Sequence, residues 1–416
     1  MTLRIALCAG ETSGDQLGAG LIDELRARFP DAEFAGIGGD GMRAAGMQTW
    51  HDASELAVMG LAEVLAHLPR LLKLRKAFRQ RVLDWKPDVF IGIDAPDFNL
   101  GVERWLKQRG VRTVHDVSPS VWAWRESRAA KIGASADRVL CLFPMEPPIY
   151  ARHGVDAVFI GHPLADEIPL QPDRDAARVA LGEAIEGPIL ALLPGSRLGE
   201  IQRMLPTFLQ AASLLHADVP GLRVLVPAAN VQCRQAIERI LLANTLSSAR
   251  PSGIALTRSS GCEPMARKQP SSPPCKQGEE TSIRVLDGQA QAAMIASDVV
   301  LLASGTAALE AMLCKRPMVI GHRISGLTYA IVKAFGLLKS AHVSLPNVLA
   351  GETLVPELLQ DDCTPANLHA ALLHWFRDAK AVTALHPRFL AIHESLRRNA
   401  SARAADAVAG LMATRA

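Results

Sequence analysis

The chain of 416 residues is long enough for two domains, each with its own hydrophobic core. Hydrophobic residues make up 49% of it and charged residues 21%, which is typical of a globular α/β protein. The net charge of +3 is too small to indicate nucleic-acid binding, so we expect no nucleic-acid partner. The sequence has no export signal and no apolar run of about 18 residues, which predicts a cytoplasmic protein whose membrane contact is peripheral.

The seven cysteines are scattered along the chain. They form no Cys-x-x-Cys pair and no Cys/His cluster with the spacing of zinc ligands. Dispersed cysteines of this kind are typical of buried thiols in a reducing compartment.

The first part of the chain alternates β-branched runs with helical patterns such as Leu17–Phe29 and Gly101–Arg109. We predict strands over Arg4–Ala9, Glu33–Ile37, Asp88–Ile93, Arg112–Val117 and Arg138–Phe143. This alternation predicts a parallel sheet with helices on both faces, a Rossmann-like domain over residues 1–170.

A second alternating series follows the connection Pro163–Asp175 and predicts a second Rossmann-like domain over residues 171–345. Its predicted strands are Ile189–Leu193, Leu222–Val226, Ile283–Leu286, Val299–Ala303 and Met318–Ile320. Two such sheets predict an interdomain cleft, with ligands at the carboxyl ends of the strands. Ser247–Ser282 is rich in Ser, Pro and Gly without a hydrophobic period, which favours a disordered surface insertion over a functional loop.

Two strand ends in the first domain are candidate sites. The first strand runs into Gly10-Glu11-Thr12-Ser13-Gly14-Asp15, which is either a ligand loop at a helix N-terminus or only a helix cap. The strand Val89–Ile93 ends in Asp94-Ala95-Pro96. A carboxylate at this point can take a proton from an attacking hydroxyl, and the alternative is an Asx turn that ends the strand.

A pair of tryptophans follows the next predicted strand, in Ser118-Pro119-Ser120-Val121-Trp122-Ala123-Trp124-Arg125. These side chains can stack on a sugar or an acyl chain. Local sequence favours packing at the edge of the core instead.

Two loops in the second domain have the character of phosphate sites. Gly195-Ser196-Arg197 closes a strand before a helix, and Arg197 can bind phosphate with two hydrogen bonds. Ser304-Gly305-Thr306 also leads a strand into a helix, where free amides can hold a diphosphate. Glu310 lies one turn further on, where it can accept hydrogen bonds from ribose hydroxyls.

The segment Leu56–Leu83 combines apolar and basic residues at helical spacing. An apolar face beside a basic cluster suits an anionic membrane surface, and a buried helix with a solvated charged face is the alternative. The residues of this expected membrane patch are Leu61, Val64, Leu65, Leu68, Leu71 and Leu72 with Arg70, Lys73, Arg75 and Lys76.

Together these motifs resemble those of the lipid-A-disaccharide synthases, bacterial glycosyltransferases with the two-domain B-type fold. The matching segments, in order, are Ala9–Asp15, Leu56–Gly60, Gly92–Asn99, Val117–Arg125, Phe159–His162, Leu192–Arg197, Leu302–Glu310 and Val343–Gly351. Only Ser247–Ser282 departs from the family pattern.

The resemblance implies an inverting transfer of 2,3-diacylglucosamine from UDP-2,3-diacylglucosamine to the 6-hydroxyl of 2,3-diacylglucosamine 1-phosphate. It implies that Asp94 is the base and that Glu11, Ser13 and Asp15 line the acceptor side. The nucleotide side would comprise Ser196, Arg197, Ser304, Gly305, Thr306, Glu310 and Asn347. No cofactor and no metal are expected, because helix ends and an arginine can neutralise the diphosphate.

The resemblance also implies binding to the inner face of the inner membrane. Residues 346–416 are expected to form a helical segment that crosses back onto the first domain or onto the partner of a homodimer. Two other functions remain open: another UDP-sugar enzyme of the same fold, and an inactive nucleotide-binding protein recruited to membranes.

Overall fold

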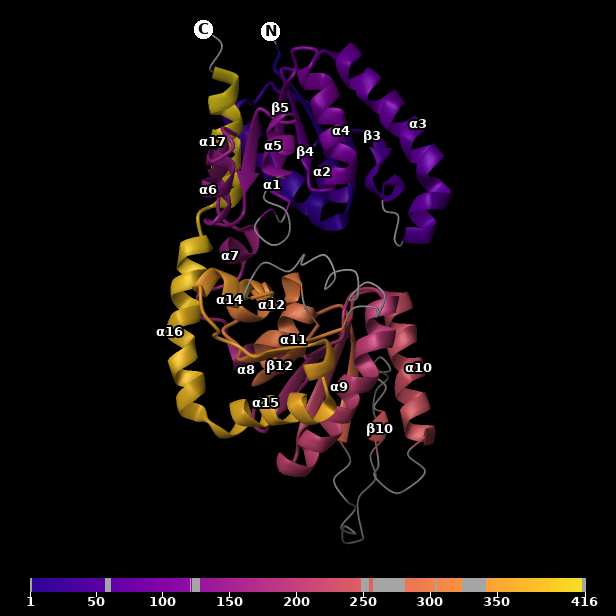
Figure 1. Ribbon diagram of the computed structural model, residues 1–416, viewed down its shortest axis with the longest axis vertical. Coiled ribbons are helices and arrows are strands. Elements are labelled where there is room, and N and C mark those ends of the chain that lie inside the picture. The colour runs from indigo at the N-terminus through magenta and orange to yellow at the C-terminus, as the bar shows by residue number, and fades with distance from the viewer. Residues whose placement is uncertain are drawn as a thin grey trace, which may run out of the picture. The chain divides into compact units, whose positions relative to one another are not determined.

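The computed structural model describes residues 2–56, 61–119, 121, 128–247, 254–256, 281–303, 305–323 and 342–413. The chain divides into two compact units (Figure 1). The first comprises Met1–Glu167 and Glu394–Ala416, and the second Ile168–Gly336 and Ala341–His393.

The first unit is built on a sheet of seven described strands in the order β3-β2-β1-β4-β5-β6-β7, all parallel. The strands are β1 Arg4–Ala9, β2 Glu33–Gly38, β3 Gln48–Asp52, β4 Val89–Ile93, β5 Arg112–Asp116, β6 Arg138–Cys141 and β7 Ala157–Phe159. The helices are α1 Thr12–Arg28, α2 Asp40–Ala44, α3 Leu61–Trp85, α4 Pro96–Lys107, α5 Arg128–Gly133, α6 Glu146–Ala151, α7 Pro163–Glu167 and α17 Ala400–Ala413.

Alternate residues of β1 face opposite sides of this sheet, as the two-residue period of a strand requires. Ile5 and Leu7 pack in a core with α1, α2 and α17, whereas Ala6 and Cys8 pack in a core with α3 and α4. Both faces are therefore covered by helices, the arrangement expected of a parallel sheet whose strands are apolar throughout.

The second unit contains another parallel sheet of seven described strands, in the order β10-β11-β9-β8-β12-β13-β14. The strands are β8 Ile189–Leu193, β9 Arg223–Ala228, β10 Ile254–Leu256, β11 Thr281–Asp287, β12 Val299–Leu302, β13 Met318–His322 and β14 Glu357–Leu359. The helices are α8 Arg174–Ala180, α9 Leu198–Asp218, α10 Val231–Ser247, α11 Ala290–Ala296, α12 Thr306–Leu313, α14 Leu345–Ala350, α15 Pro365–Arg377 and α16 Ala379–Leu396, which ends in the first unit.

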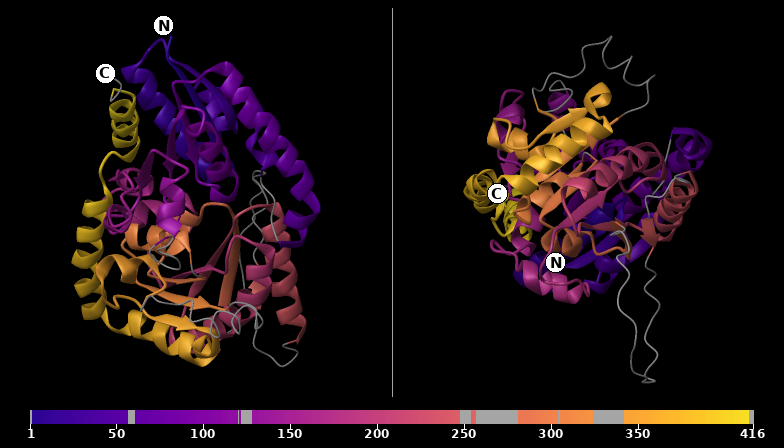
Figure 2. Two further views of the ribbon diagram at one scale, coloured as in Figure 1. Left: turned by 45° about the horizontal axis from the view of Figure 1, so that its top comes forward. Right: turned by 90° about the horizontal axis from the view of Figure 1, so that it is seen from below.

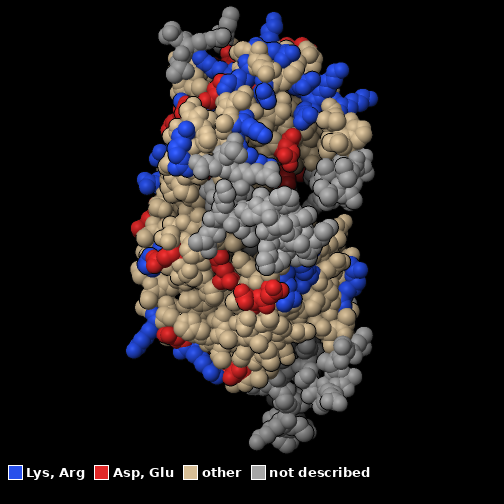
Figure 3. Space-filling model, in the orientation of Figure 1, with Lys and Arg blue, Asp and Glu red and all other residues tan. Residues whose placement is uncertain are grey.

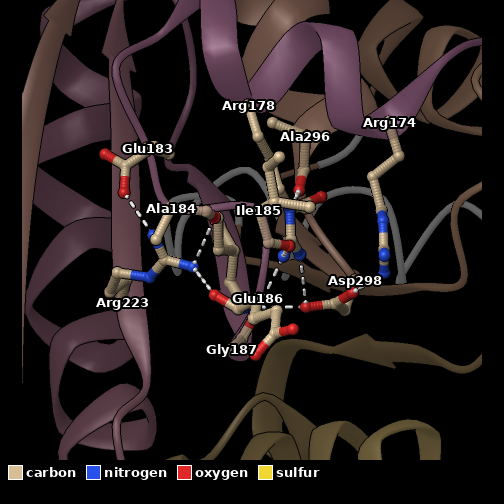
Figure 4. Close-up of polar contacts among 12 residues, drawn as sticks. Arg174, Arg178, Glu183, Ala184, Ile185, Glu186, Gly187, Arg223, Ala296 and Asp298 are labelled. Carbon is tan, nitrogen blue, oxygen red and sulfur yellow. Dashed lines mark hydrogen bonds and ion pairs between the residues drawn. The ribbon is translucent and has the colours of Figure 1, made fainter.

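A buried arginine lies at the amino-terminal ends of the central strands of the second sheet (Figure 4). Arg178 of α8 is 1% exposed and donates to the carbonyl oxygens of Ala296 at 2.8 Å and Gly187 at 3.0 Å, and to that of Ile185. It also pairs with Asp298 at 2.9 Å. The buried charge is thus neutralised and hydrogen-bonded, which offsets much of its desolvation cost.

The carboxyl-terminal part of the chain differs from the expected division at residue 345. β14 pairs with β13 and α15 packs on α9, so residues up to His393 belong to the second unit. The last part of the chain, Glu394–Ala416, belongs to the first unit, where α17 packs against α1, α7, β5 and β6 (Figure 1 and Figure 2).

The expected insertion Ser247–Ser282 is also only partly correct. Ile254–Leu256 forms strand β10, which pairs with β11, and β11 itself begins at Thr281. Residues 248–253 and 257–280 lie outside the described residues.

Candidate functional site

The order of strands reverses between β1 and β4 in the first sheet. These strands are paired in parallel, with Ala9 opposite Ile93, so the loops that follow them emerge side by side. In open parallel sheets this reversal is the usual place for a ligand. It brings together Gly10–Asp15 and Asp94–Asn99, two of the segments of this unit that the sequence singled out.

Asp94 lies in an unusual backbone conformation at this point. Its φ is 49° and that of Ala95 is 43°, both in the left-handed region that residues with a Cβ rarely adopt. Each such residue costs about 1–2 kcal/mol. The Asp94 N–H donates to the Asp116 carbonyl oxygen at 2.9 Å, and its side chain is half-buried. Strain retained at a strand end is characteristic of functional sites, and a carboxylate there can act as a general base.

The acceptor-side candidates on the neighbouring loop differ in exposure. Glu11 and Ser13 are exposed at the start of α1, available to a ligand. Asp15 is 7% exposed and accepts hydrogen bonds from the amides of Gly39 at 2.6 Å, Gly41 at 2.8 Å and Met42 at 3.1 Å. These bonds favour a structural role for Asp15, which holds the start of α2.

Asp116 is an acidic neighbour that the sequence pattern did not single out. It ends β5 opposite Ile93 and is 4% exposed. Burial of its carboxyl raises its pKa to about 6; the charge of Asp94 adds to the rise, whereas His115 and the Val117 amide oppose it. An acidic residue near the carboxyl end of a predicted strand was the available sequence signal.

A buried acid–base pair lies beneath the same strand ends. Glu103 Oε1 and His115 Nδ1 are 2.7 Å apart, and both side chains are fully buried. Burial raises the pKa of Glu103 despite the opposing charge of His115. The pair contacts the sheet at Gly92, where the Cβ of any other residue would stand 2.1 Å from Glu103 Oε1; only glycine leaves room for it.

The second sheet reverses between β8 and β12, and the loops after these strands line a cavity of about 410 Å³. Lining residues from the predicted nucleotide side are Ser196, Arg197, Gly305, Thr306 and Glu310. Ser304 lies outside the described residues. The structure thus brings together all the described nucleotide-side candidates except Asn347.

Two helices begin at this cavity. Arg197 is the N-cap of α9 and Gly305 the N-cap of α12, so the unpaired amides of both first turns provide partial positive charge. The Arg197 side chain is 67% exposed and free to reach an anion, apart from a 3.4 Å contact with Glu200. This combination of helix ends and a guanidinium suits a diphosphate.

Glu200 is a second residue that the sequence pattern did not single out. Its carboxylate accepts from the Ser196 amide at 3.3 Å and contacts Arg197, so it braces the phosphate-type loop. Gly195 makes this possible, because its φ is 124° and a Cβ there would lie 2.5 Å from Glu200 Oε2. An acidic residue in the first turn of a helix is the corresponding sequence signal.

Asn347 lies in α14 with no exposed surface. Its amide group donates to the Val355 carbonyl and to Glu357, and its oxygen accepts from the amides of Leu354 and Val355. Its hydrogen-bonding capacity is thereby filled. These bonds favour a structural role for Asn347. The nucleotide contact that the sequence suggests for it stays a prediction.

The expected membrane patch lies on α3. Leu68 is 41% and Leu72 45% exposed, whereas Phe78 and Val82 further along the helix are fully buried against the sheet. Figure 3 shows Lys and Arg side chains gathered over the face that α3 covers. Arg70, Lys73 and Lys76 are exposed, and Leu71 and Arg75 are half-buried. The side chains of Leu61, Val64 and Leu65 are outside the described residues, as are Trp122, Trp124 and Arg125.

None of the helices in the described part of the chain is both long and apolar enough to cross a membrane.

A profile of the lipid-A-disaccharide synthetase family matches residues 5–257 and 262–409 of the chain. The lipid-A-disaccharide synthase of Xanthomonas axonopodis pv. citri (strain 306) is 63% identical over 412 residues, 99% of this chain and 87% of that protein. That of Xylella fastidiosa (strain M12) is 59% identical over 412 residues, 99% of each chain.

Solved structures share the fold at low identity. UDP-GlcNAc 2-epimerase from Neisseria meningitidis, bound to UDP-GlcNAc, aligns with a TM-score of 0.59 and 10% identity over 100% of both chains. The calicheamicin glycosyltransferase CalG4 aligns with a TM-score of 0.56 and 16% identity over 100% of this chain and 99% of that one. The expected α/β architecture with two Rossmann-like domains, the B-type glycosyltransferase fold, is confirmed.

Proposed function

The chain belongs to the lipid-A-disaccharide synthetase family and is a glycosyltransferase of lipid A biosynthesis, and from this premise we propose its substrates and residue roles. The donor is UDP-2,3-diacylglucosamine and the acceptor is the 6-hydroxyl of 2,3-diacylglucosamine 1-phosphate. A bond forms between the acceptor oxygen and the donor C1 while the bond from C1 to the UDP oxygen breaks. One displacement inverts the anomeric centre and gives the β-1,6-linked disaccharide 1-phosphate and UDP.

Asp94 takes the proton of the acceptor hydroxyl in this proposal. The observation that carries the assignment is its half-buried carboxylate on a strained turn at the reversal of the first sheet. A general base must lie within hydrogen-bonding reach of the attacking hydroxyl, and this strand end is the ligand face of the unit. Exposed Glu11 and Ser13 on the adjoining loop contact the acceptor sugar.

The diphosphate of the donor binds in the second unit between the first turns of α9 and α12. Arg197 forms charge-assisted hydrogen bonds to it, while Gly305 and Thr306 offer backbone amides. Glu310 lines the same cavity and accepts from ribose hydroxyls. These groups stabilise the charge of the leaving UDP, so we expect the reaction to need neither a metal ion nor a cofactor.

Both substrates carry acyl chains, and the enzyme must meet them at a lipid surface. The exposed leucines of α3, Leu68 and Leu72, enter the boundary of an anionic bilayer, and neighbouring Lys73 and Lys76 bind its headgroups. We place this contact at the inner face of the inner membrane. A homodimer remains a prediction of the family resemblance.

The central test is disaccharide formation from the two substrates by purified protein in EDTA. Absence of product refutes the proposed transfer, and activity that requires added metal refutes the account of the diphosphate. A UDP-sugar epimerase of the same fold would instead epimerise the sugar of the donor when no acceptor is present.

A pair of variants separates the role of Asp94 as base from that of Arg197 in diphosphate binding. Asp94→Asn is expected to lower turnover by about 10²–10⁴-fold with UDP affinity unchanged, because it removes the base but not the nucleotide site. Arg197→Ala is expected to weaken UDP binding measured by calorimetry. Wild-type turnover in Asp94→Asn would remove this carboxylate from the mechanism.

A further inference from the structure

The side chain of Asn99 is an unusual choice for its position in α4. Asn99 has no exposed surface and lies in the first turns of the helix, where asparagine has a low helix propensity. Burial of an amide side chain is unfavourable unless its polar atoms are hydrogen-bonded. A purely structural helix would be better served by an apolar residue here, so the bonds that this side chain makes indicate its role.

Those bonds all go to the ends of two strands. Asn99 Nδ2 lies 3.1 Å from the carbonyl oxygen of Cys8, 3.2 Å from that of Ile93 and 2.8 Å from that of Asp94. This orientation of the amide is favoured, because a flipped group would place its oxygen against three carbonyl oxygens, although Oδ1 has no hydrogen-bond partner among the described residues. One NH₂ group therefore connects the end of β1 to the end of β4.

The peptide groups on both sides of Asp94 are hydrogen-bonded, one to Asp116 and the other to Asn99. Its N–H donates to the Asp116 carbonyl oxygen at 2.9 Å, and its own carbonyl oxygen accepts from Asn99. Asp94 and Ala95 are both left-handed, a conformation that persists only when surrounding contacts impose it. The Asn99 amide is such a contact, and it comes from the helix that the strained turn itself begins.

The same amide sets the distance between the two loops at the sheet reversal. A Cβ added at Gly10 would lie 2.7 Å from the Ala95 Cβ, so the β1 loop and the Asp94 turn are already in close contact. Asn99 bonds to Cys8, two residues before Gly10. A shift of either strand end would break a bond to the same nitrogen.

We propose that Asn99 is a positioning residue for Asp94: its buried amide holds the left-handed Asp94–Ala95 turn and the adjoining β1 loop in the geometry that proton transfer requires. The catalytic part of this inference rests on the proposed role of Asp94 as base. The structural part, that Asn99 holds the turn, stands independently of that role.

The test compares two variants with a control. Asn99→Leu keeps the approximate volume and removes both donors. Asn99→Asp keeps the shape and retains one donor only while its carboxyl is protonated. Thr113→Val is the matched control, since it removes buried hydrogen bonds of Thr113 on β5 to the Ser135 carbonyl and Asp137 without contact to the Asp94 turn.

Asn99→Leu is expected to lower kcat by about 10²-fold, the effect of a displacement of about 1 Å in a reacting group. KM for both substrates should change by less than about threefold, because the substrate contacts remain. For Asn99→Asp, the ratio of its kcat to that of the wild type should fall as pH rises and the introduced carboxyl loses its donor. Thr113→Val should leave kcat unchanged.

Hydrogen exchange supplies a readout that does not depend on activity. Peptides covering residues 90–98 should exchange faster in Asn99→Leu than in the wild type, and Thr113→Val should not accelerate them. Unchanged exchange in this segment, or a folded Asn99→Leu with wild-type kcat, overturns the proposal. If Asn99→Leu does not fold, the pH-dependent ratio of Asn99→Asp decides, and a ratio independent of pH overturns it. An inactive wild type would refute the proposed transfer but leave the exchange experiment intact.

Discussion

Substitution of Asp116 by asparagine should stabilise the first unit at alkaline pH. The Asp116 carboxyl is 4% exposed at the end of β5, and burial raises its pKa from 3.8 to about 6. A carboxyl whose pKa is higher in the folded than in the unfolded protein holds its proton more tightly when folded. The favourable contribution of the protonated Asp116 carboxyl to the free energy of unfolding is therefore complete below pH 3.8 and is lost as pH rises through about 6.

The size of the stabilisation expected for Asp116→Asn follows from the shift in the pKa of Asp116. A change of one pKa unit corresponds to about 1.4 kcal/mol, so a rise of about two units corresponds to about 3 kcal/mol at pH 8. Asparagine is uncharged at every pH, and its oxygen can still accept from the Val117 amide, as Asp116 Oδ1 does at 3.0 Å. The variant should therefore be more stable than the wild type by up to about 3 kcal/mol at pH 8 and nearly equal to it at pH 4.

Urea unfolding followed by tryptophan fluorescence measures this difference. Of the six tryptophans, only Trp375 lies outside residues 1–167, so the signal reports mainly on the first unit. Asp84→Asn, at an exposed carboxyl of α3, is the control and should show no pH-dependent gain. A gain for Asp116→Asn that is the same at pH 4 and pH 8 would refute the reasoning.

Three further perturbations test other parts of the structure. Arg178→Met should lower the free energy of unfolding of the second unit, measured by calorimetry, by about 3–5 kcal/mol, because it leaves Asp298 and three carbonyl groups short of a partner. Gly195→Ala should weaken UDP binding about tenfold in calorimetric titration, since a φ of 124° strains alanine. Leu68→Ser with Leu72→Ser should release the protein from anionic vesicles in a sedimentation assay.

For each of these three predictions, one result would contradict the expected outcome. Unchanged unfolding of Arg178→Met would mean that the buried guanidinium does not hold α8 on the sheet. Wild-type UDP affinity in Gly195→Ala would show that the loop tolerates rearrangement. For the vesicles, Leu214→Ser with Leu242→Ser is the control, because these leucines are 46% and 53% exposed on other helices. Equal loss of binding in both pairs would point to general surface hydrophobicity.

Continuous apolar runs identified the central strands of both sheets. The sequence predicted β1 and β8 with the boundaries that the structure has, and the other interior strands to within about two residues. The strands that it did not predict, β3, β7, β10 and β14, are the edges of the two sheets. β3, Gln48–Asp52, and β14, Glu357–Leu359, are only half-buried and carry polar residues, so they lack the pattern of a central strand.

The loops with chemical character were also visible in the sequence, because strand ends in a parallel sheet mark the ligand face. Asp94 and Arg197 were selected for that reason, and both lie at reversals of strand order. Asp15 and Asn347 have the same polar character in sequence. Only their hydrogen bonds to backbone groups indicate that they hold loops together.

The sequence alone determined the α/β class, the two-domain organisation and the family, because hydrophobic periodicity and motif identity are local properties. Tertiary structure decided what distant segments do to one another. It made α17 part of the first unit, set Asp116 beside the strand of Asp94, and directed the Asn99 amide to two strand ends. Burial, backbone strain and hydrogen-bond partners depend on residues far apart in the chain, and a one-dimensional pattern does not contain them.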